Sequence, residues 1–297
     1  MKSRHSTQSQ RLSPPRIAVL MTCHNRRALT VRCLEGLRAQ QSEAEVALFV
    51  VDDGSSDGTA DSVRAAWPAA RVIRGDGSLF WNGGMRLAWD NAAKAGPFTH
   101  YLWLNDDVVL DPGALDRLLR EAAALAGADG AVIVAGSTRR PGSEEGTYGG
   151  QQRTNPKRPL RLTLAPPGAA PAAVDSVSGN IVLVSAAAFA RLGNLSPVFV
   201  HIFGDLDYGL RARAAGIPVY AGSGFFGECE GPDMTGTSLD PQLSRWHRLR
   251  LRWGEERKVH ARDWRTFVVR HAKAGPLRIV YSLTPWWRIL RTPRTPA

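Results

Sequence analysis

Short apolar runs alternate with segments of helical spacing along the first half of the chain. Runs of four or five apolar residues at Ile17 to Met21, Ala47 to Val51 and Tyr101 to Leu104 predict buried strands, and Arg71 to Arg74 predicts a shorter one. Amphipathic helices are predicted from Leu29 to Leu37, Ser56 to Trp67, Met85 to Ala95 and Leu115 to Leu125. This alternation predicts an α/β fold, with a mostly parallel sheet flanked by helices.

The second half is less regular. From about Ser137 to Val174 the residues Gly, Pro, Arg and Thr predominate, which predicts a long loop or hairpin beside the functional site. The run from Val177 to Val184 predicts a strand, and the amphipathic segment from Asp205 to Ala215 predicts a helix that ends at the following glycine. Asp111, which directly precedes a proline, is predicted to cap the helix before this region.

These patterns predict a main domain with two appendages. With 297 residues, of which 43% are hydrophobic, the chain can bury one large core, which we expect at residues 17–240. Residues 1–16 are polar and basic and lack the apolar stretch of a signal peptide, so we expect a disordered lead-in. Residues 241–297 are predicted to form a basic helical extension.

Cysteine content and hydropathy bear on the location of the protein. The three cysteines, Cys23, Cys33 and Cys229, lack the spacing of a disulfide framework. This favours a reducing compartment, and we expect the protein in the cytoplasm. No uninterrupted apolar run reaches about 18 residues, the length that a membrane-spanning helix needs.

The formal net charge of +11 favours a polyanionic partner, which can be nucleic acid, an anionic lipid surface or a phosphorylated substrate. From Arg245 onward, arginines alternate with tryptophans. This composition suits peripheral association with an anionic membrane, but it also suits helices that pack on the core with a solvated arginine face. The tryptophans concerned are Trp246, Trp253, Trp264, Trp286 and Trp287.

Acidic residues gather directly after two predicted strands. Asp52 and Asp53 follow one strand, and Asn105-Asp106-Asp107 follows another. The carboxyl ends of parallel strands are where α/β proteins hold nucleotides, and hard cations such as Mg²⁺ or Mn²⁺ prefer carboxylate and phosphate oxygens. Asp and Asn are also ordinary turn residues, and the two uses can coexist.

A glycine-rich segment from Gly75 to Gly84 lies between these clusters. It allows the backbone to approach a ligand closely, and Trp81 offers a flat surface on which a sugar can stack. The alternative is a turn with a core tryptophan. Gly77, Trp81, Asn82 and Gly83 are the candidate substrate contacts here.

The chemistry-bearing motifs occur in one order between about Ile17 and Glu230. They are Thr22-Cys-His-Asn-Arg, Val51-Asp-Asp-Gly-Ser-Ser-Asp-Gly-Thr, Phe80-Trp-Asn-Gly-Gly, Leu104-Asn-Asp-Asp-Val and Gly204-Asp-Leu-Asp-Tyr-Gly-Leu-Arg-Ala-Arg. With these motifs in this order, the chain resembles the family-2 glycosyltransferases with the GT-A fold, and within them the bacterial rhamnosyltransferase-like branch.

The resemblance implies roles for individual residues. It assigns Asp107 to the metal and Asp205 to the catalytic base, and it makes residues 17–110 the donor-binding half and residues 111–240 the acceptor-binding half. Asp207 is left to acceptor contact or local structure. The residues assigned to donor binding are Thr22, Asn25, Asp52, Asp53 and Asp106.

Three positions depart from the family pattern. Asn105 replaces the first acid of the metal motif, and Gly204 replaces the first acid of the motif that contains the base. Many relatives have a His near the metal, where this chain has Cys229. A hard cation disfavours a thiol ligand, so Cys229 is not assigned to the metal.

The implied reaction is a single inverting displacement with Mg²⁺ or Mn²⁺ as cofactor. The donor is expected to be a dTDP-, UDP- or GDP-sugar, with dTDP-rhamnose favoured, and the acceptor a polysaccharide or lipid-linked glycan. Two alternatives stay open. A sugar nucleotidyltransferase would have a glycine-rich pyrophosphate loop after its first strand, where this chain has Thr22 to Asn25. A nucleic-acid-binding protein would explain the basic charge, although we expect no nucleic-acid partner.

Overall fold

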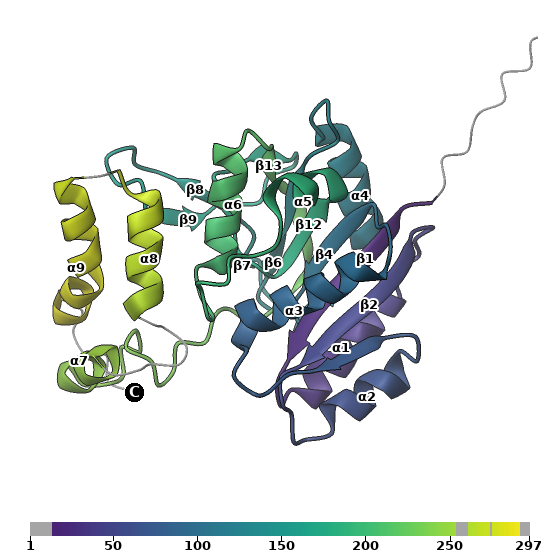
Figure 1. The fold of residues 1–297 in the computed structure, drawn as a ribbon, viewed down its shortest axis with the longest axis horizontal. Helices are drawn as coiled ribbons and strands as arrows, with labels where there is room; N and C mark the ends of the chain where they lie inside the picture. The colour runs from purple at the N-terminus through teal and green to yellow at the C-terminus, as the bar shows by residue number, and fades with distance from the viewer. Residues whose placement is uncertain (1–13, 254–260, 274, 292–297) are drawn as a thin grey trace, which may run out of the picture.

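The computed structural model describes residues 14–253, 261–273 and 275–291. Helices cover both faces of a central sheet, and three further helices lie at one side (Figure 1). The sheet has the strand order β10-β13-β6-β12-β4-β1-β2-β3, with β5 and β7 paired at its margin. Its strands are β1 (Arg16–Cys23), β2 (Glu45–Asp52), β3 (Arg71–Arg74), β4 (His100–Leu104), β5 (Val109–Leu110), β6 (Ile133–Arg139), β7 (Gly146–Tyr148), β10 (Ala172–Ala173), β12 (Ile181–Ser185) and β13 (Val219–Glu228).

Alternating side chains of the buried strands divide the core into two layers. In β1, Ala18 and Leu20 face α3, α5 and α6, whereas Ile17 and Val19 face α1, α2 and α4. The predicted α/β fold with helices on both faces is confirmed. The helices are α1 (Arg27–Arg38), α2 (Thr59–Ala66), α3 (Phe80–Ala95), α4 (Ala114–Leu125), α5 (Ala186–Leu192) and α6 (Gly204–Ala214).

Four neighbouring strands bring the acidic segments to one edge. β3, β2, β1 and β4 run parallel, and Cys23 at the end of β1 pairs with Asp52 at the end of β2. β12 is antiparallel to β4, with Ile181 opposite Leu104, so the residues that precede β12 reach the same edge. The carboxyl ends of these four strands therefore meet the start of a fifth, β12.

The glycine-rich segment is a short turn followed by a helix. α3 begins at Phe80, five residues before the predicted start, so the prediction of a loop up to Gly84 was wrong. The carboxylate of Asp53 accepts hydrogen bonds from the backbone N–H groups of Gly77 (2.8 Å) and Phe80 (3.0 Å). The segment has no capping side chain of its own at the start of α3, and Asp53 from the loop after β2 satisfies backbone N–H groups there instead.

Two other local predictions were wrong. α4 begins at Ala114 with Gly113 at its cap position, and the carboxylate of Asp111 instead pairs with Arg139 at 2.8 Å. The expected strand at 177–184 is two strands, because residues 178–180 interrupt it. The segment at 137–174, expected to be a long loop or hairpin, contains short strands, among them the antiparallel pair β8 (Gly150–Arg153) and β9 (Leu162–Leu164). With β11 (Ser176–Val177), this pair forms a small second sheet of three strands.

The C-terminal region forms α7 (Arg245–Trp253), α8 (Ala261–His271) and α9 (Pro276–Arg291). α8 packs on the main body, where Phe267 and Val268 join a buried cluster with Leu210 of α6. α8 lies between α9 and α6 in Figure 1. None of the helices in the described ranges is long and apolar enough to cross a membrane. Of the predicted lead-in, residues 1–13 lie outside the described residues, and Arg16 already belongs to β1.

Candidate active site

The turn after β4 presents one carboxylate to solvent. The amide oxygen of Asn105 accepts a hydrogen bond from Nε1 of Trp81 at 2.7 Å, so this amide holds the turn against α3. Asp106 is buried, and burial raises its pKa to about 6, with the neighbouring Asp107 adding to the effect. The side chain of Asp107 keeps 21% of its surface exposed. Asp107 is therefore the more accessible of the two acids in this turn.

Arg26, in the loop between β1 and α1, bridges the two acids of this turn. Its Nη1 lies 3.1 Å from Oδ1 of Asp106 and 2.8 Å from Oδ2 of Asp107. Burial alone would lower the pKa of Arg26, but the two carboxylates raise it above its ordinary value. The guanidinium thus supplies positive charge at the position where the sequence predicted a cation.

Cys229, at the end of β13, also contacts this turn. Its thiol donates a weak hydrogen bond to Oδ1 of Asp107 (3.4 Å) and accepts one from Nδ2 of Asn180 (3.2 Å). Burial, and then the charge of Asp107, raises the pKa of this thiol to about 12. It is neutral at physiological pH and suits a packing and hydrogen-bonding role better than that of a thiolate ligand.

The donor set fits a hard cation that brings most of its own ligands. Within the described ranges there is no cluster of three or more His, Cys, Asp or Glu side chains that could hold a metal ion. Mg²⁺ and Mn²⁺ commonly use one or two carboxylates and complete their shells with phosphate oxygens and water. The exposed carboxylate of Asp107, already paired with a cationic group, is compatible with such an ion.

A second cluster joins the loops that follow β1 and β2. Asn25, with a positive φ of 50°, donates its backbone N–H to Oγ of Ser55 at 2.9 Å, and its side-chain oxygen accepts from the N–H of Ser56 at 2.8 Å. Oδ1 of Asp52 accepts from the N–H of Ser55 at 2.9 Å. Asn25 and Asp52 therefore hold one pair of loops. The side chain of Thr22, near the end of β1, instead lies against Gly84 of α3.

Asp53 serves local structure with both of its oxygens. These are the oxygens that bind the N–H groups of Gly77 and Phe80. Asp57 likewise accepts from the N–H groups of Thr59 (3.0 Å) and Arg27 (3.1 Å). The turn-forming alternative raised by the sequence thus applies to both acids.

Asp205, in the first turn of α6, is the candidate base. Its Oδ2 accepts from the N–H of Gly179 at 2.7 Å and its Oδ1 from the N–H of Leu206 at 2.8 Å. Burial raises the pKa of this carboxyl, and the backbone hydrogen bonds oppose the shift. A carboxylate with a raised pKa is a better proton acceptor near neutral pH than an exposed one.

Residues 178–180, which sequence reasoning missed, connect this carboxylate to the acidic turn. Gly179 binds Asp205, and the carbonyl of Asn180 accepts from the N–H of Asn105 at 3.0 Å. A Cβ at Gly179 would overlap the ring of Trp81 and lie 3.3 Å from the Cβ of Asp205. The polar interruption Ser-Gly-Asn within an apolar run was the available signal.

Tyr148 at the end of β7 was also missed. Burial raises the pKa of its phenol, and the charges of Cys229, Asp107 and Asp205 add to the shift in that order. The phenol therefore lies within electrostatic reach of both the acidic turn and the candidate base. The sequence offered no local signal, because this residue falls in the segment predicted as a loop.

Asn82, Gly83 and Asp207 were predicted as substrate contacts, but they do not face this site. Asn82 is buried in α3, and its amide donates to the carbonyls of Ser196 and Phe199. Gly83 lies in α3, where a Cβ would meet only its neighbour Leu79. A side chain at Gly204 would collide with the amide oxygen of Asn82, which explains why the first acid of the family motif is missing.

Asp207 is fully buried beneath α8. Its carboxylate pairs with Arg211 (2.9 Å), Arg270 (2.8 Å) and His271 (2.8 Å). Of the two roles considered for this residue, local structure fits these contacts. The carboxylate joins α6 to the C-terminal helices.

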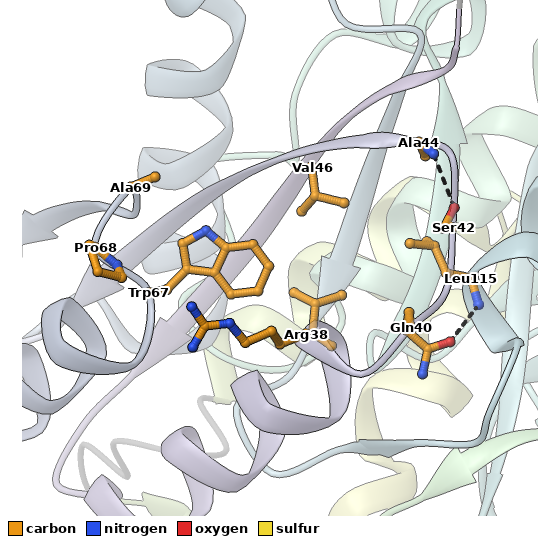
Figure 2. Close-up of a pocket in the computed structure, with 10 residues that line it drawn as sticks. Arg38, Gln40, Ser42, Ala44, Val46, Trp67, Pro68, Ala69 and Leu115 are labelled. Carbon is orange, nitrogen blue, oxygen red and sulfur yellow. Dashed lines mark hydrogen bonds between the residues drawn. The ribbon is translucent and has the colours of Figure 1, made fainter.

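Two hollows lie near the strand termini, and only one adjoins this cluster. The pocket in Figure 2, of about 340 Å³, lies at the start of β2 between Arg38, Val46 and Trp67, at the sheet edge opposite Asp52. A second hollow of about 690 Å³ is lined by Asn25 and Arg26. The chemistry-bearing residues thus cluster at the carboxyl edge of the parallel strands.

Comparisons with known proteins bear on the fold and the family of the chain. A mannosyltransferase from Pyrobaculum calidifontis, PcManGT, solved in complex with GDP-Man and Mn²⁺, is similar in fold with a TM-score of 0.54 and 16% identity, covering 93% of this chain and 70% of that chain. The comparison with curated proteins found no match. The model of glycosyl transferase family 2 matches residues 18–181, more than half of the chain. The chain therefore belongs to glycosyltransferase family 2.

Proposed function

We propose that this protein is an inverting glycosyltransferase of the rhamnosyltransferase-like branch. It would transfer a sugar from a nucleoside diphosphate donor to a hydroxyl group of a polysaccharide or lipid-linked glycan. The observation that carries the proposal is the connection of Asp205 to the acidic turn through Gly179 and Asn180. It joins a carboxylate with a raised pKa to a turn suited to a diphosphate.

Asp205 is the proposed base. It would remove the proton of the acceptor hydroxyl as that oxygen attacks the anomeric carbon of the donor. The two backbone N–H groups that bind the carboxylate fix its direction, which favours in-line alignment of the reacting groups. No covalent intermediate is needed for this reaction, so alignment and charge stabilisation account for the acceleration.

Asp107 is the proposed ligand of a Mg²⁺ or Mn²⁺ ion, and such an ion would neutralise charge on the leaving diphosphate. Asn105 positions the turn through its hydrogen bond to Trp81, and the buried Asp106 holds Arg26 beside Asp107. The Mn²⁺ in the complex of the mannosyltransferase supports a divalent cation as the cofactor.

The donor nucleoside is proposed to bind at Thr22, Asn25, Asp52 and Asp53. Asn25 and the loop after β2 form one rigid unit there, which supports this placement. We propose dTDP-rhamnose or a UDP-sugar as the donor. The GDP-Man held by the mannosyltransferase makes GDP-sugars the necessary comparison.

The reaction is proposed to take place in the cytoplasm, at the inner face of the cytoplasmic membrane. A lipid-linked acceptor would be presented there, and the C-terminal helices are basic. Residues 111–240 are proposed to bind the acceptor. Family membership favours glycosyl transfer over both the nucleotidyltransferase and the nucleic-acid-binding alternatives.

A donor panel tests the proposal. The purified protein is incubated with dTDP-rhamnose, UDP-sugars and GDP-sugars, with Mn²⁺ or Mg²⁺ and a membrane extract as the acceptor source. Release of the nucleoside diphosphate is measured, and one donor class is expected to be consumed. As a control, a known glycosyltransferase must transfer sugar to the same extract. If that control works and no donor releases its nucleoside diphosphate with this protein, the proposed function is overturned.

A further inference from the structure

Large apolar side chains are exposed almost exclusively at the C-terminal end of the described chain. Ten such residues are exposed among the described residues, and nine of them lie in α7, α8 and α9. Trp246 and Trp253 of α7 have 82% and 84% of their surface exposed to solvent. Contiguous exposed apolar surface on a protein commonly marks an interaction site.

Five of the six large apolar residues that are exposed on α9 form one face of the helix, and Leu277 lies outside it. Ile279, Val280, Leu283, Trp287 and Leu290 are all exposed. At 3.6 residues per turn they fall within an arc of about 100°. Ile289, on the opposite side, is buried. This helix therefore turns its apolar face away from the protein, the reverse of a helix that packs on a core.

α7 extends this face. Trp246 and Trp253 are seven residues apart and lie on the same side of α7. The ring of Trp253 contacts that of Trp286 in α9, with 5.7 Å between ring centroids. In Figure 1 both helices lie on the side of α8 that is remote from the sheet. We define the C-terminal apolar face as seven of the eight exposed large apolar residues of the two helices, leaving out Leu277, namely Trp246, Trp253, Ile279, Val280, Leu283, Trp287 and Leu290.

The charged side chains that α7 and α9 themselves carry have one sign. Neither α7 nor α9 contains an Asp or Glu. The guanidinium of Arg291 lies over the ring of Trp287, 5.0 Å from its centroid. Arginine beside tryptophan at the rim of an apolar stripe is the arrangement of a helix that lies in the interface of an anionic membrane.

We propose that the C-terminal apolar face is a docking surface for a bilayer containing anionic phospholipids. The apolar side chains would enter the boundary between headgroups and acyl chains. The exposed arginines of the two helices, Arg245, Arg250, Arg288 and Arg291, would contact lipid phosphates, whereas Arg248 and Arg252 are buried in the protein. A second copy of the chain fits less well, because joining two such faces would bring arginines of like charge together.

Docking would also orient the candidate active site. α8 lies between the apolar face and α6, and Arg270 and His271 of α8 bind Asp207, two residues after Asp205 in α6. The bilayer would thus lie at a fixed side of the catalytic cluster. The docking itself is independent of glycosyl transfer, and only its use for a lipid-linked acceptor rests on the proposed function.

Vesicle flotation tests the surface directly, without donor or acceptor. The full chain is mixed with vesicles of phosphatidylcholine, with or without phosphatidylglycerol. Binding is expected to vesicles that contain phosphatidylglycerol, to weaken with salt, and to shift tryptophan emission to the blue. Leu283→Ser combined with Trp287→Ser is expected to weaken this binding by about tenfold or more, because two large apolar side chains would no longer be buried in the bilayer.

The matched control is Leu29→Ser, which removes the exposed leucine of α1, outside this face. It is expected to bind vesicles as the unchanged chain does. Thermal melting of each variant establishes that it is folded. Unchanged vesicle binding by the folded double variant would overturn the proposal. Equal binding to vesicles with and without phosphatidylglycerol would also overturn it. A third contradicting result would be an unchanged chain that does not bind vesicles but forms a dimer in light scattering, with the double variant monomeric.

Discussion

The guanidinium of Arg26 lies 2.8 Å from the carboxylate of Asp107, the group that we propose as the metal ligand. The guanidinium of Arg26 and a metal ion would therefore compete for the carboxylate of Asp107. Arg26 is itself half-exposed, with 46% of its side-chain surface accessible, so it can move toward solvent or a diphosphate. Metal affinity should then depend on a residue that is not a ligand.

Arg26→Ala is expected to raise the affinity for Mn²⁺ without nucleotide by about fivefold. The reason is that a partly exposed ion pair contributes about 1 kcal/mol, and its loss frees the carboxylates. Electron paramagnetic resonance of free Mn²⁺ measures this affinity without catalysis. Arg27→Ala, which changes the adjacent exposed arginine, is the control. Unchanged affinity in Arg26→Ala would contradict the competition.

Asp107→Ala is expected to abolish the part of nucleoside diphosphate affinity that depends on Mn²⁺, because the ion loses its protein carboxylate. Calorimetric titration with and without Mn²⁺ measures it. Asp61→Ala, at an exposed acid of α2, should keep the full metal dependence. An Asp107→Ala variant with undiminished dependence would remove this residue from the metal site.

Asp205→Asn is expected to lower kcat by about 10²- to 10⁴-fold while donor binding stays nearly unchanged, because only the proton acceptor is lost. Steady-state kinetics and donor titration separate the two effects. Turnover close to that of the unchanged enzyme would exclude Asp205 as the base.

The pH dependence follows from the raised pKa of Asp205. A base works only when deprotonated, so kcat should rise with pH through this pKa. The acidic limb is therefore expected above the ordinary aspartate value of about 3.9. A pH–kcat profile measures the limb, and a profile still flat at pH values near 4 would contradict the shift.

Gly179→Ala is expected to lower transfer activity by about 10²-fold, because the added methyl group would displace Trp81 or Asp205. The φ of Gly179 is not positive, so backbone strain is not the cause. Gly168→Ala, where the nearest atom is 3.5 Å away, is the control for activity and melting temperature. Full activity in Gly179→Ala would show that this contact does not position the base.

Asp207→Asn is expected to destabilise the fold by about 1–3 kcal/mol, because the amide loses the charge-assisted hydrogen bonds from the partly exposed Arg211 and Arg270. Urea unfolding measures the loss. Asp61→Asn on the surface should change stability little. Equal unfolding midpoints for the two variants would contradict the role of Asp207.

The stability that Asp207 contributes should also depend on pH. Burial tends to raise the pKa of this carboxyl, but hydrogen bonds from His271 and Arg270 hold it below its usual range. A lowered folded-state pKa means that the contribution is fully present above the unfolded value of about 3.9 and is lost as pH falls through the folded value. Unfolding free energies compared between Asp207→Asn and the unchanged chain down to acidic pH test this window.

Local patterns in the sequence determined the framework of this protein. Apolar periodicity identified β1 to β4 and the helices between them, because strand and helix periods differ and each depends on neighbouring residues. Parallel strands end at one edge, so the acidic residues after β2 and β4 could be predicted to gather there.

The tertiary structure decided what those residues contact. Arg26 meets Asp106 across 80 positions, and Cys229 meets Asp107 across 122. Residues 178–180 and Tyr148 are likewise brought to the site by long-range contacts. A local sequence pattern cannot predict them, because it does not determine which distant loops lie at the same edge of the sheet. Asn105, Gly204 and Cys229, where the chain departs from its family, each adjoin such a contact.

The C-terminal helices show the same division. Their alternation of arginine and tryptophan is evident in the sequence, but it suits both a core-packing helix and a membrane-facing one. Packing separates the two uses, because α8 buries Phe267 and Val268 against the main body, while α9 keeps Leu283 and Trp287 exposed. A sequence determines how amphipathic a helix is, and only the assembled fold determines whether its apolar face is covered.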